Sequence, residues 1–296
     1  MIDVNEIKEG KDGLEVKEWF ATEFENSLVD LDKKPERPKP VISIGETRIG
    51  SKTYPNGIMT QGEMSAISAP SKSYKTYLKS HLAASFLRSH YDEYLTDICG
   101  HREQDECLID LDTEQGKYWS WNTFNRTRLL TGKLQQNSYY PFKLRHLNPL
   151  DRVKFIDKVV NSNMIKAKPK LIFIDGVADL IQDSNDLVMS NEISERIMTW
   201  TDVYGIHVCV IIHNAFNTTK PTGHLGSAII KKAETVISLK PETEKDISGN
   251  EKKTGIVEAN HLYSRGKPFE SFKFKKHDTE DRLELSHAEE VFNDNF

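Results

Sequence analysis

The sequence has 296 residues, of which 37% are hydrophobic and 29% are charged, and its formal net charge is −5. This composition predicts a soluble protein that can bury a core, and no apolar run approaches the ~18 residues of a membrane span. The N-terminus has no basic region followed by an apolar stretch, so we expect no secretory signal and a cytoplasmic location. Cys99, Cys107 and Cys209 lack metal-binding spacing, and the latter two lie in apolar runs that predict buried thiols.

Charge is distributed unevenly along the chain. Residues 1–40 carry 11 acidic and 7 basic side chains, and residues 278–296 carry 7 acidic and 1 basic, which leaves residues 41–277 net basic. A mildly basic body with acidic ends is compatible with a polyanionic partner, although a solvated surface explains it equally well. We therefore predict an N-terminal arm and linker at 1–40, a core at 41–277 and an acidic C-terminal tail at 278–296.

The N-terminal arm is predicted to be helical over residues 4–31, because apolar residues recur there at helical spacing. Residues 33–40 contain three prolines and form a linker. The arm either docks on a neighbouring subunit or packs against its own chain, and the sequence favours neither.

Apolar strands alternate with helices in the rest of the chain. After two short strands at 41–45 and 47–51 and a turn at 54–57, an apolar strand leads through a tight loop into a helix that runs to about residue 90. Further strands are expected at 106–114, 142–147, 170–175, 206–213, 236–239, 255–263 and 269–275, helices at 119–130, 149–161 and 191–204, and a polar connection at 241–253. This alternation predicts an α/β fold with a largely parallel sheet.

The tight loop has the spacing of a phosphate-binding loop, G-x-x-x-x-G-K-[ST]. Backbone N–H groups at a helix N-terminus bind phosphates, the lysine places a cation at the β/γ-phosphates, and the hydroxyl binds Mg²⁺, so the pattern predicts ATP and Mg²⁺ as ligands. The nucleotide-contacting residues are predicted to be Ala69, Pro70, Ser71, Lys72, Ser73, Tyr74, Lys75 and Thr76. Ala69 and Tyr74 replace the two glycines, and we expect Tyr74 to fit only with a negative φ. A plain strand-to-helix turn explains the loop by itself equally well.

Three polar residues follow apolar strands and are expected at the sheet edge that carries this loop, since ligands of parallel sheets bind there. Asp175 suits a role in holding Mg²⁺, together with Thr76. Glu114 suits a proton acceptor for a water that attacks the γ-phosphate, and His213 suits a contact to that phosphate. Each residue also has a structural alternative: Asp175 as a surface acid at a strand end, Glu114 as a first-turn acid of the next helix, and His213 as a histidine that caps a strand.

A long polar loop follows His213 and contains residues suited to a nucleic acid. Lys220, Lys231 and Lys232 could contact phosphates, and Phe216 could stack on a base. An ordinary mobile loop is the alternative.

Four stretches together resemble the RecA-like hexameric ATPases, especially the RepA-type replicative helicases and their relatives on mobile elements of Bacteroidetes. They are residues 68–76, 108–115, 171–180, and 210–214 with 223–239. The resemblance implies a RecA-like P-loop core in which Lys75 and Thr76 bind phosphate and Mg²⁺. It assigns Glu114 as the catalytic carboxylate, Asp175 as the Walker B acid and His213 as the γ-phosphate sensor.

The resemblance also implies partners and a process. It predicts a homo-oligomer, a hexamer as in that family, in which Arg265 or Lys267 reaches the nucleotide of the neighbouring subunit. It also predicts a helicase that acts on single-stranded DNA during plasmid or mobile-element replication. Two alternatives stay open. One is a KaiC-like regulatory or defence ATPase with a protein partner, and the other is a slow nucleotide-binding scaffold, because Tyr74 departs from the loop pattern.

Overall fold

The computed structural model describes residues 11–214, 223–245 and 251–286. The chain divides into two units, Met1–Arg37 and Pro38–Phe296. The boundary lies within the proline-rich linker, three residues before the one that the sequence predicts.

The first unit contains α1 (Lys11–Ser27), which confirms a helix in that part of the predicted arm. The helix ends at Ser27 rather than at residue 31, and residues 1–10 lie outside the described residues. Trp19, Phe20 and Phe24 are all more than half exposed. Whether this apolar surface docks on another subunit stays a prediction.

The second unit is built on a nine-stranded sheet whose order is β12-β11-β10-β9-β3-β8-β7-β5-β6. Six neighbouring strands are parallel, and a three-stranded antiparallel extension continues from β9. The parallel strands are β9 (Thr235–Lys245), β3 (Met64–Ala69), β8 (His207–His213), β7 (Lys168–Asp175), β5 (Glu106–Asp112) and β6 (Tyr139–Lys143). The extension consists of β10 (Glu251–Ser264), β11 (Phe272–Lys276) and β12 (Leu283–Leu285). The predicted α/β class with a mostly parallel sheet is confirmed.

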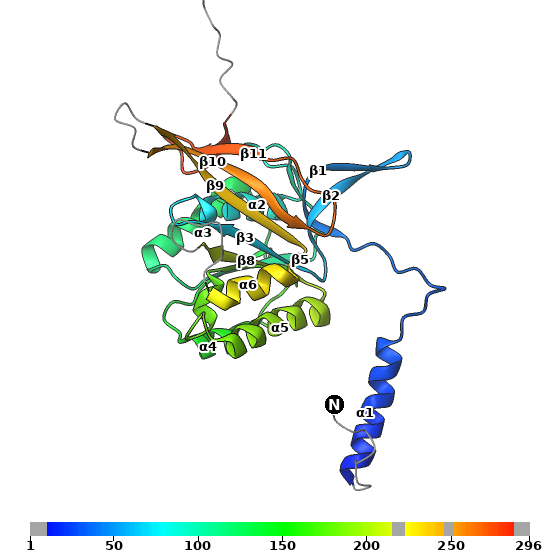
Figure 1. Ribbon diagram of the computed structural model, residues 1–296. Coiled ribbons are helices and arrows are strands. Elements are labelled where there is room, and N and C mark those ends of the chain that lie inside the picture. Colours follow the sequence, from blue (N-terminus) through cyan, green and yellow to red (C-terminus); the bar gives the residue numbers. More distant parts are fainter. Residues whose placement is uncertain (1–10, 215–222, 246–250, 287–296) are drawn as a thin grey trace, which may run out of the picture. The chain divides into compact units, whose positions relative to one another are not determined.

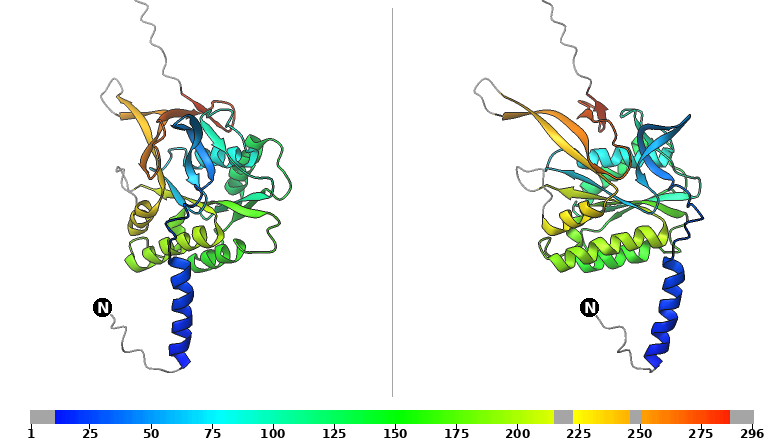
Figure 2. Two further views of the ribbon diagram at one scale, coloured as in Figure 1. Left: turned by 90° about the vertical axis from the view of Figure 1, so that its right-hand side faces the viewer. Right: turned by 45° about the vertical axis from the view of Figure 1, so that its right-hand side comes forward.

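Helices cover both faces of this sheet (Figures 1 and 2). One face carries α2 (Lys75–Arg88) and α3 (Lys117–Thr131); the other carries α4 (Pro149–Val159), the short 3₁₀ helix η2 (Val177–Leu180), α5 (Leu187–Tyr204) and α6 (Gly223–Lys232). The two faces form separate apolar clusters, with α2 in one and α4, α5 and α6 in the other. Because both faces are covered, the central strands are buried along their length, which explains their uninterrupted apolar sequences.

A second, three-stranded sheet has the order β2-β1-β4 and contains β1 (Pro40–Ile49), β2 (Lys52–Thr60) and β4 (Ile98–Gly100). The two short strands predicted at 41–45 and 47–51 are therefore wrong, because one strand crosses both. The chain turns at Gly50, whose φ of 60° is free of strain only for glycine, and the turn predicted at 54–57 lies inside β2.

Several other boundaries differ from the predictions. β6 begins three residues before the strand predicted at 142–147 and ends at Lys143, α6 was not expected, and β9 and β10 extend into the connection predicted at 241–253. β12 lies within the predicted acidic tail, where Leu283 is fully buried and pairs with β11, so the folded unit continues past residue 277. Leu283 is buried because β12 packs against α2, and a local sequence pattern does not reveal a contact between such distant segments. Residues 287–296 lie outside the described part.

Two smaller expectations concern cysteines and membrane spans. Cys107 and Cys209 are buried free thiols, as predicted, and Cys99 is half-buried. None of the helices in the described part of the chain combines the length and hydrophobicity that crossing a membrane requires.

Candidate functional site

The loop between β3 and α2 adopts a backbone that glycine would adopt without strain. β3 ends at Ala69, α2 begins at Lys75, and two residues between them are left-handed, Lys72 with φ 60° and Tyr74 with φ 59°. The expectation of a negative φ at Tyr74 is wrong. Its ring packs against the core and lies edge-on to Tyr77 at 5.8 Å between centroids, which offsets part of the strain. The loop thus keeps the turn that follows β3 although it lacks both glycines.

Lys75 is held inside this loop. Its Nζ donates to the carbonyl oxygen of Pro70 at 3.0 Å, more weakly to that of Ala69 at 3.4 Å, and to Nδ1 of His213 at 3.2 Å. Burial lowers the pKa of Lys75, and the nearby carboxylates of Asp175 and Glu114 oppose that effect. The ammonium group of Lys75 therefore faces the loop, and an incoming anion can replace the carbonyl oxygens of Ala69 and Pro70 as its hydrogen-bond acceptors.

His213, at the end of β8, connects Lys75 to Glu114. Nδ1 accepts from Lys75, so Nε2 carries the proton and donates to Oε1 of Glu114 at 3.1 Å. This hydrogen bond lowers the pKa of Glu114, against the opposing effect of burial. Glu114 is an ionised carboxylate at neutral pH, the form that can accept a proton.

Asp175 and Asp112 end neighbouring parallel strands and are paired in register. One carboxylate oxygen of each, Oδ2, is buried and has no hydrogen-bond partner among the described residues. Burial raises the pKa of Asp175 to about 6, although Lys79 lies 3.6 Å from its Oδ2 and favours the charged form. Lys79 is itself fully buried and bonded to Asp110 at 2.7 Å.

Asp112 is a site residue that sequence reasoning missed, since it was read as an acid next to a helix. Its Oδ1 accepts from the backbone N–H groups of Glu114 at 3.0 Å and Gln115 at 2.8 Å, so it shapes the turn that presents Glu114. No cluster of three or more metal-binding side chains occurs in the described residues. Two orphaned carboxylate oxygens nevertheless fit Mg²⁺, which retains several waters and takes one or two protein carboxylates.

Gly176 is a second residue that the sequence did not reveal. A Cβ atom at this position would lie 2.4 Å from Oε1 of Glu114, much closer than van der Waals contact. Its φ is −103°, so the backbone conformation does not require glycine, and the missing side chain leaves the space that the Glu114 carboxylate occupies. A glycine directly after a strand-ending aspartate is the signal that could have suggested it.

Lys75, Glu114, Asp175 and His213 line one cavity of about 340 Å³, a volume within the range of small-ligand sites, and Asp112 and Gly176 lie behind its lining. Its lining comprises Ser71, Lys72, Ser73, Tyr74, Lys75, Thr76, Tyr77, Glu114, Gln115, Trp119, Asn122, Thr123, Arg126, Asp175 and His213. A larger groove of about 1190 Å³ lies along α4, η2 and α5, but none of the converging residues lines it. The smaller cavity is therefore the candidate site, and it gathers the phosphate loop, both predicted carboxylates and His213.

The remaining predicted residues lie elsewhere. Arg265 pairs with Glu63 at 2.8 Å and bonds to the carbonyl of Lys232, at the amino end of β3 and so at the opposite edge of the sheet. Lys232 also pairs with Glu195, and Lys231 precedes it at the end of α6. α6 carries these two lysines back to where β9 starts, at the edge opposite the loop, and contacts from them to a nucleic acid stay a prediction.

Lys267 bonds to the carbonyl oxygen of Glu46 at 3.2 Å and does not line the cavity. Reaching a neighbouring subunit's nucleotide stays a prediction for Arg265 and Lys267. Phe216 and Lys220 lie outside the described residues.

Comparison of the sequence with protein-family models gives no match, and comparison with curated proteins gives none either.

Proposed function

We propose that the chain is a RecA-like ATPase that hydrolyses ATP in the cavity beside the Ala69–Thr76 loop. One observation carries the proposal: Lys75, Glu114, Asp175 and His213, each at or just after the end of a different parallel strand, line the same cavity. Hydrolysis of a phosphoanhydride needs compensation of phosphate charge and a positioned proton acceptor. This set supplies both.

The proposed roles follow from the contacts. Lys75 exchanges the carbonyl groups of Ala69 and Pro70 for phosphate oxygens and compensates their charge. Glu114 accepts a proton from the attacking water, and its low pKa keeps it ionised for that task. When Lys75 turns to the phosphates, Nδ1 of His213 loses its donor, and a proton taken up there lets His213 donate to the terminal phosphate. This contact links the state of that phosphate to the chain that follows β8.

Mg²⁺ would be held by Asp175 and the hydroxyl of Thr76, two residues that line the cavity, and Asp112 is the other carboxylate with an oxygen that lacks a hydrogen-bond partner. When bound, it compensates the charge that develops on the phosphates. Asp175 is the better-suited carboxylate of the two, because it lines the cavity. The position of the Asp175 carboxylate is held by Lys79, which is itself bonded to Asp110.

The most concrete version of this proposal is a RepA-type helicase, a ring of subunits that moves on single-stranded DNA in plasmid or mobile-element replication. Its support is the order of the four motifs along the chain and the long polar segment that follows His213. The opposite-edge positions of Lys231 and Lys232 give no support to DNA contacts through these two residues. A regulatory ATPase with a protein partner is the second candidate.

Steady-state ATP hydrolysis with and without single-stranded DNA, together with the mass in solution, tests the proposal. We expect turnover that DNA stimulates, a mass of several subunits, and loss of turnover in Lys75→Ala. Lys133→Ala serves as a matched control, because Lys133 is an exposed lysine that does not line the cavity. Turnover that DNA leaves unchanged favours the regulatory ATPase. Unchanged turnover in Lys75→Ala overturns the ATPase assignment itself.

A further inference from the structure

We propose that Arg126 binds the nucleoside part of the nucleotide, through its base or ribose, and that the segment between β11 and β12 holds Arg126 in place for this task. The inference deepens the proposed function and rests on it. It concerns residues that none of the sequence motifs includes. It also brings a segment near the C-terminus into the site.

One face of α3 forms the wall of the cavity that faces the phosphate loop. Trp119, Asn122, Thr123 and Arg126 all line the cavity, and their spacing of three, four and seven residues places them on one side of the helix. Trp119 is 62% exposed despite its size, so its indole ring is available to a ligand. An exposed aromatic face is a surface on which a base can stack.

Arg126 itself is almost fully buried, with 7% of its surface exposed. Its guanidinium carbon lies over the Tyr77 ring, 3.6 Å from the centroid, and its Nε and Nη2 donate to Asp281 at 3.0 and 3.4 Å. Nη1 is buried and has no hydrogen-bond partner among the described residues. A buried donor of a charged group is costly to leave unpaired, so an acceptor is expected at this position.

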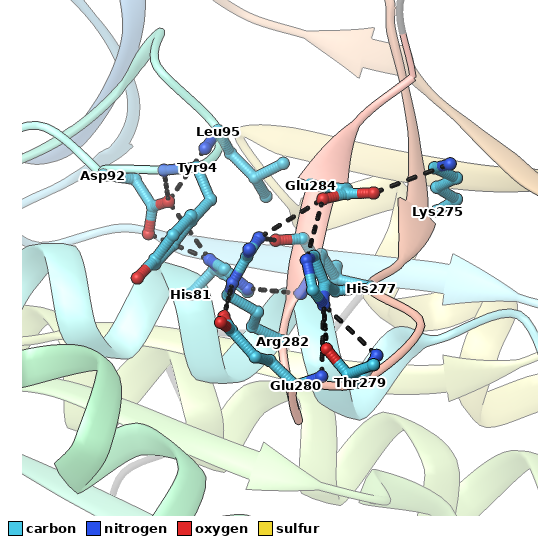
Figure 3. A network of polar contacts seen from close by, with 11 residues as sticks. His81, Asp92, Tyr94, Leu95, Lys275, His277, Thr279, Glu280, Arg282 and Glu284 are labelled. Carbon is cyan, nitrogen blue, oxygen red and sulfur yellow. Dashed lines mark hydrogen bonds and ion pairs between the residues drawn. The ribbon is translucent and has the colours of Figure 1, made fainter.

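Asp281 is fixed from several sides. Its Oδ1 accepts from the Tyr77 hydroxyl at 2.6 Å, so α2, α3 and the segment after β11 meet at one carboxylate. The adjoining residues are held as well, since Nε2 of His81 accepts from the backbone N–H of Leu283 at 2.9 Å and Arg282 lies 4.1 Å from the centroid of the Tyr94 ring. Figure 3 shows His81, Tyr94 and Arg282 within this network. The guanidinium therefore has a single orientation before any ligand arrives.

The surroundings of Nη1 favour a nucleoside over a phosphate as its partner. Asp281 pairs with Arg126 at 3.0 Å, and although Lys276 lies 3.9 Å from the same carboxylate, that carboxylate would repel a phosphate placed beside it. Tyr77, on which Arg126 stacks, follows Lys75 by two residues in α2, so Arg126 lies beyond the loop where phosphates are expected. A neutral acceptor atom of the base or ribose meets both conditions.

Titration calorimetry with Mg²⁺ and two ligands, ATP and inorganic tripolyphosphate, separates the two kinds of contact. Arg126→Met removes the donor, and we expect it to weaken ATP binding about tenfold, the effect of one charge-assisted hydrogen bond, while tripolyphosphate binding changes less than twofold. Arg128→Met is the matched control, since Arg128 is an exposed arginine on the same helix. We expect it to leave both affinities unchanged.

Equal losses for ATP and tripolyphosphate would overturn the inference in favour of a phosphate contact, and unchanged ATP affinity would overturn it altogether. If the methionine variant does not fold, Arg126→Lys keeps the charge and loses the planar fork, and the same selective loss for ATP is expected. Failure of the wild-type protein to bind either ligand counts against the proposed function. Wild-type binding with an unchanged Arg126 variant counts against this inference alone.

Discussion

Nε2 of His213 lies 3.1 Å from Oε1 of Glu114, although 99 residues separate the two in the chain. The other ring nitrogen of His213 lies 3.2 Å from Nζ of Lys75. One imidazole thus connects the proposed proton acceptor to the proposed phosphate-binding lysine. A ligand that takes Lys75 away from His213 also changes the surroundings of Glu114, which couples binding to the chemistry.

Replacement of the proposed proton acceptor should separate turnover from binding. In Glu114→Gln the amide has the size of the carboxylate but cannot accept the proton, so we expect ATP turnover to fall at least 100-fold. We expect ATP affinity to change only a few-fold, because Lys75 and the loop are intact. Turnover and equilibrium binding measure the two effects, and Glu192→Gln on α5 is an exposed control. Retained turnover would exclude Glu114 as the acceptor.

A methyl group at position 176 should act on Glu114 alone. The Cβ of Gly176→Ala would lie 2.4 Å from Oε1 of Glu114, at the end of a flexible side chain that can move away. We expect the fold and ATP binding to persist, and turnover to fall about tenfold or more as the contact between Glu114 and His213 is lost. Thermal melts and kinetics check this. A variant that unfolds, or that turns over normally, contradicts the explanation.

The left-handed backbone at residue 74 can be tested with a pair of variants. Tyr74→Gly and Tyr74→Ala both remove the ring, but only glycine adopts a φ of 59° without strain. We expect the glycine variant to be more stable than the alanine variant by about 1 kcal/mol. Urea denaturation measures the difference. Equal stabilities would mean that this backbone relaxes once the ring is gone.

The buried Glu234 predicts a pH dependence of stability. Burial raises its pKa to about 7, although Thr60 donates two hydrogen bonds to it. The folded state then holds a proton that the unfolded state releases between about pH 4.5 and 7, so this group makes the protein less stable as pH rises through that window. His207, 3.5 Å away, has a pKa that burial lowers to about 4, and its contribution changes in the opposite direction.

Glu234→Gln removes the first of these two contributions. We expect the stability of the variant relative to the wild type to increase by roughly 3 kcal/mol between pH 4.5 and pH 7.5, from 1.36 kcal/mol per pKa unit. Denaturation at several pH values measures this, with the exposed Glu192→Gln as control. A difference that does not depend on pH would show that folding leaves the pKa of Glu234 unchanged.

The sequence by itself determined what is local in this protein. Apolar runs that end in Asp175 and His213, and a loop with phosphate-binding spacing, are patterns within a few residues. In parallel strands the carboxyl ends share one edge of the sheet. These patterns were therefore enough to predict that Lys75, Glu114 and Asp175 lie close together, and all three line the same cavity.

Only the tertiary structure decided which distant residues complete that cavity. Arg126 bonds to Asp281, which lies 155 residues further along the chain, and Glu114 occupies the space that a side chain at Gly176 would fill. Both contacts depend on the order of the strands and on the packing of α2 and α3. The same holds for Lys231 and Lys232, whose place depends on the direction of α6. Such contacts arise when elements far apart in the chain bury a common surface, and no short-range periodicity records that.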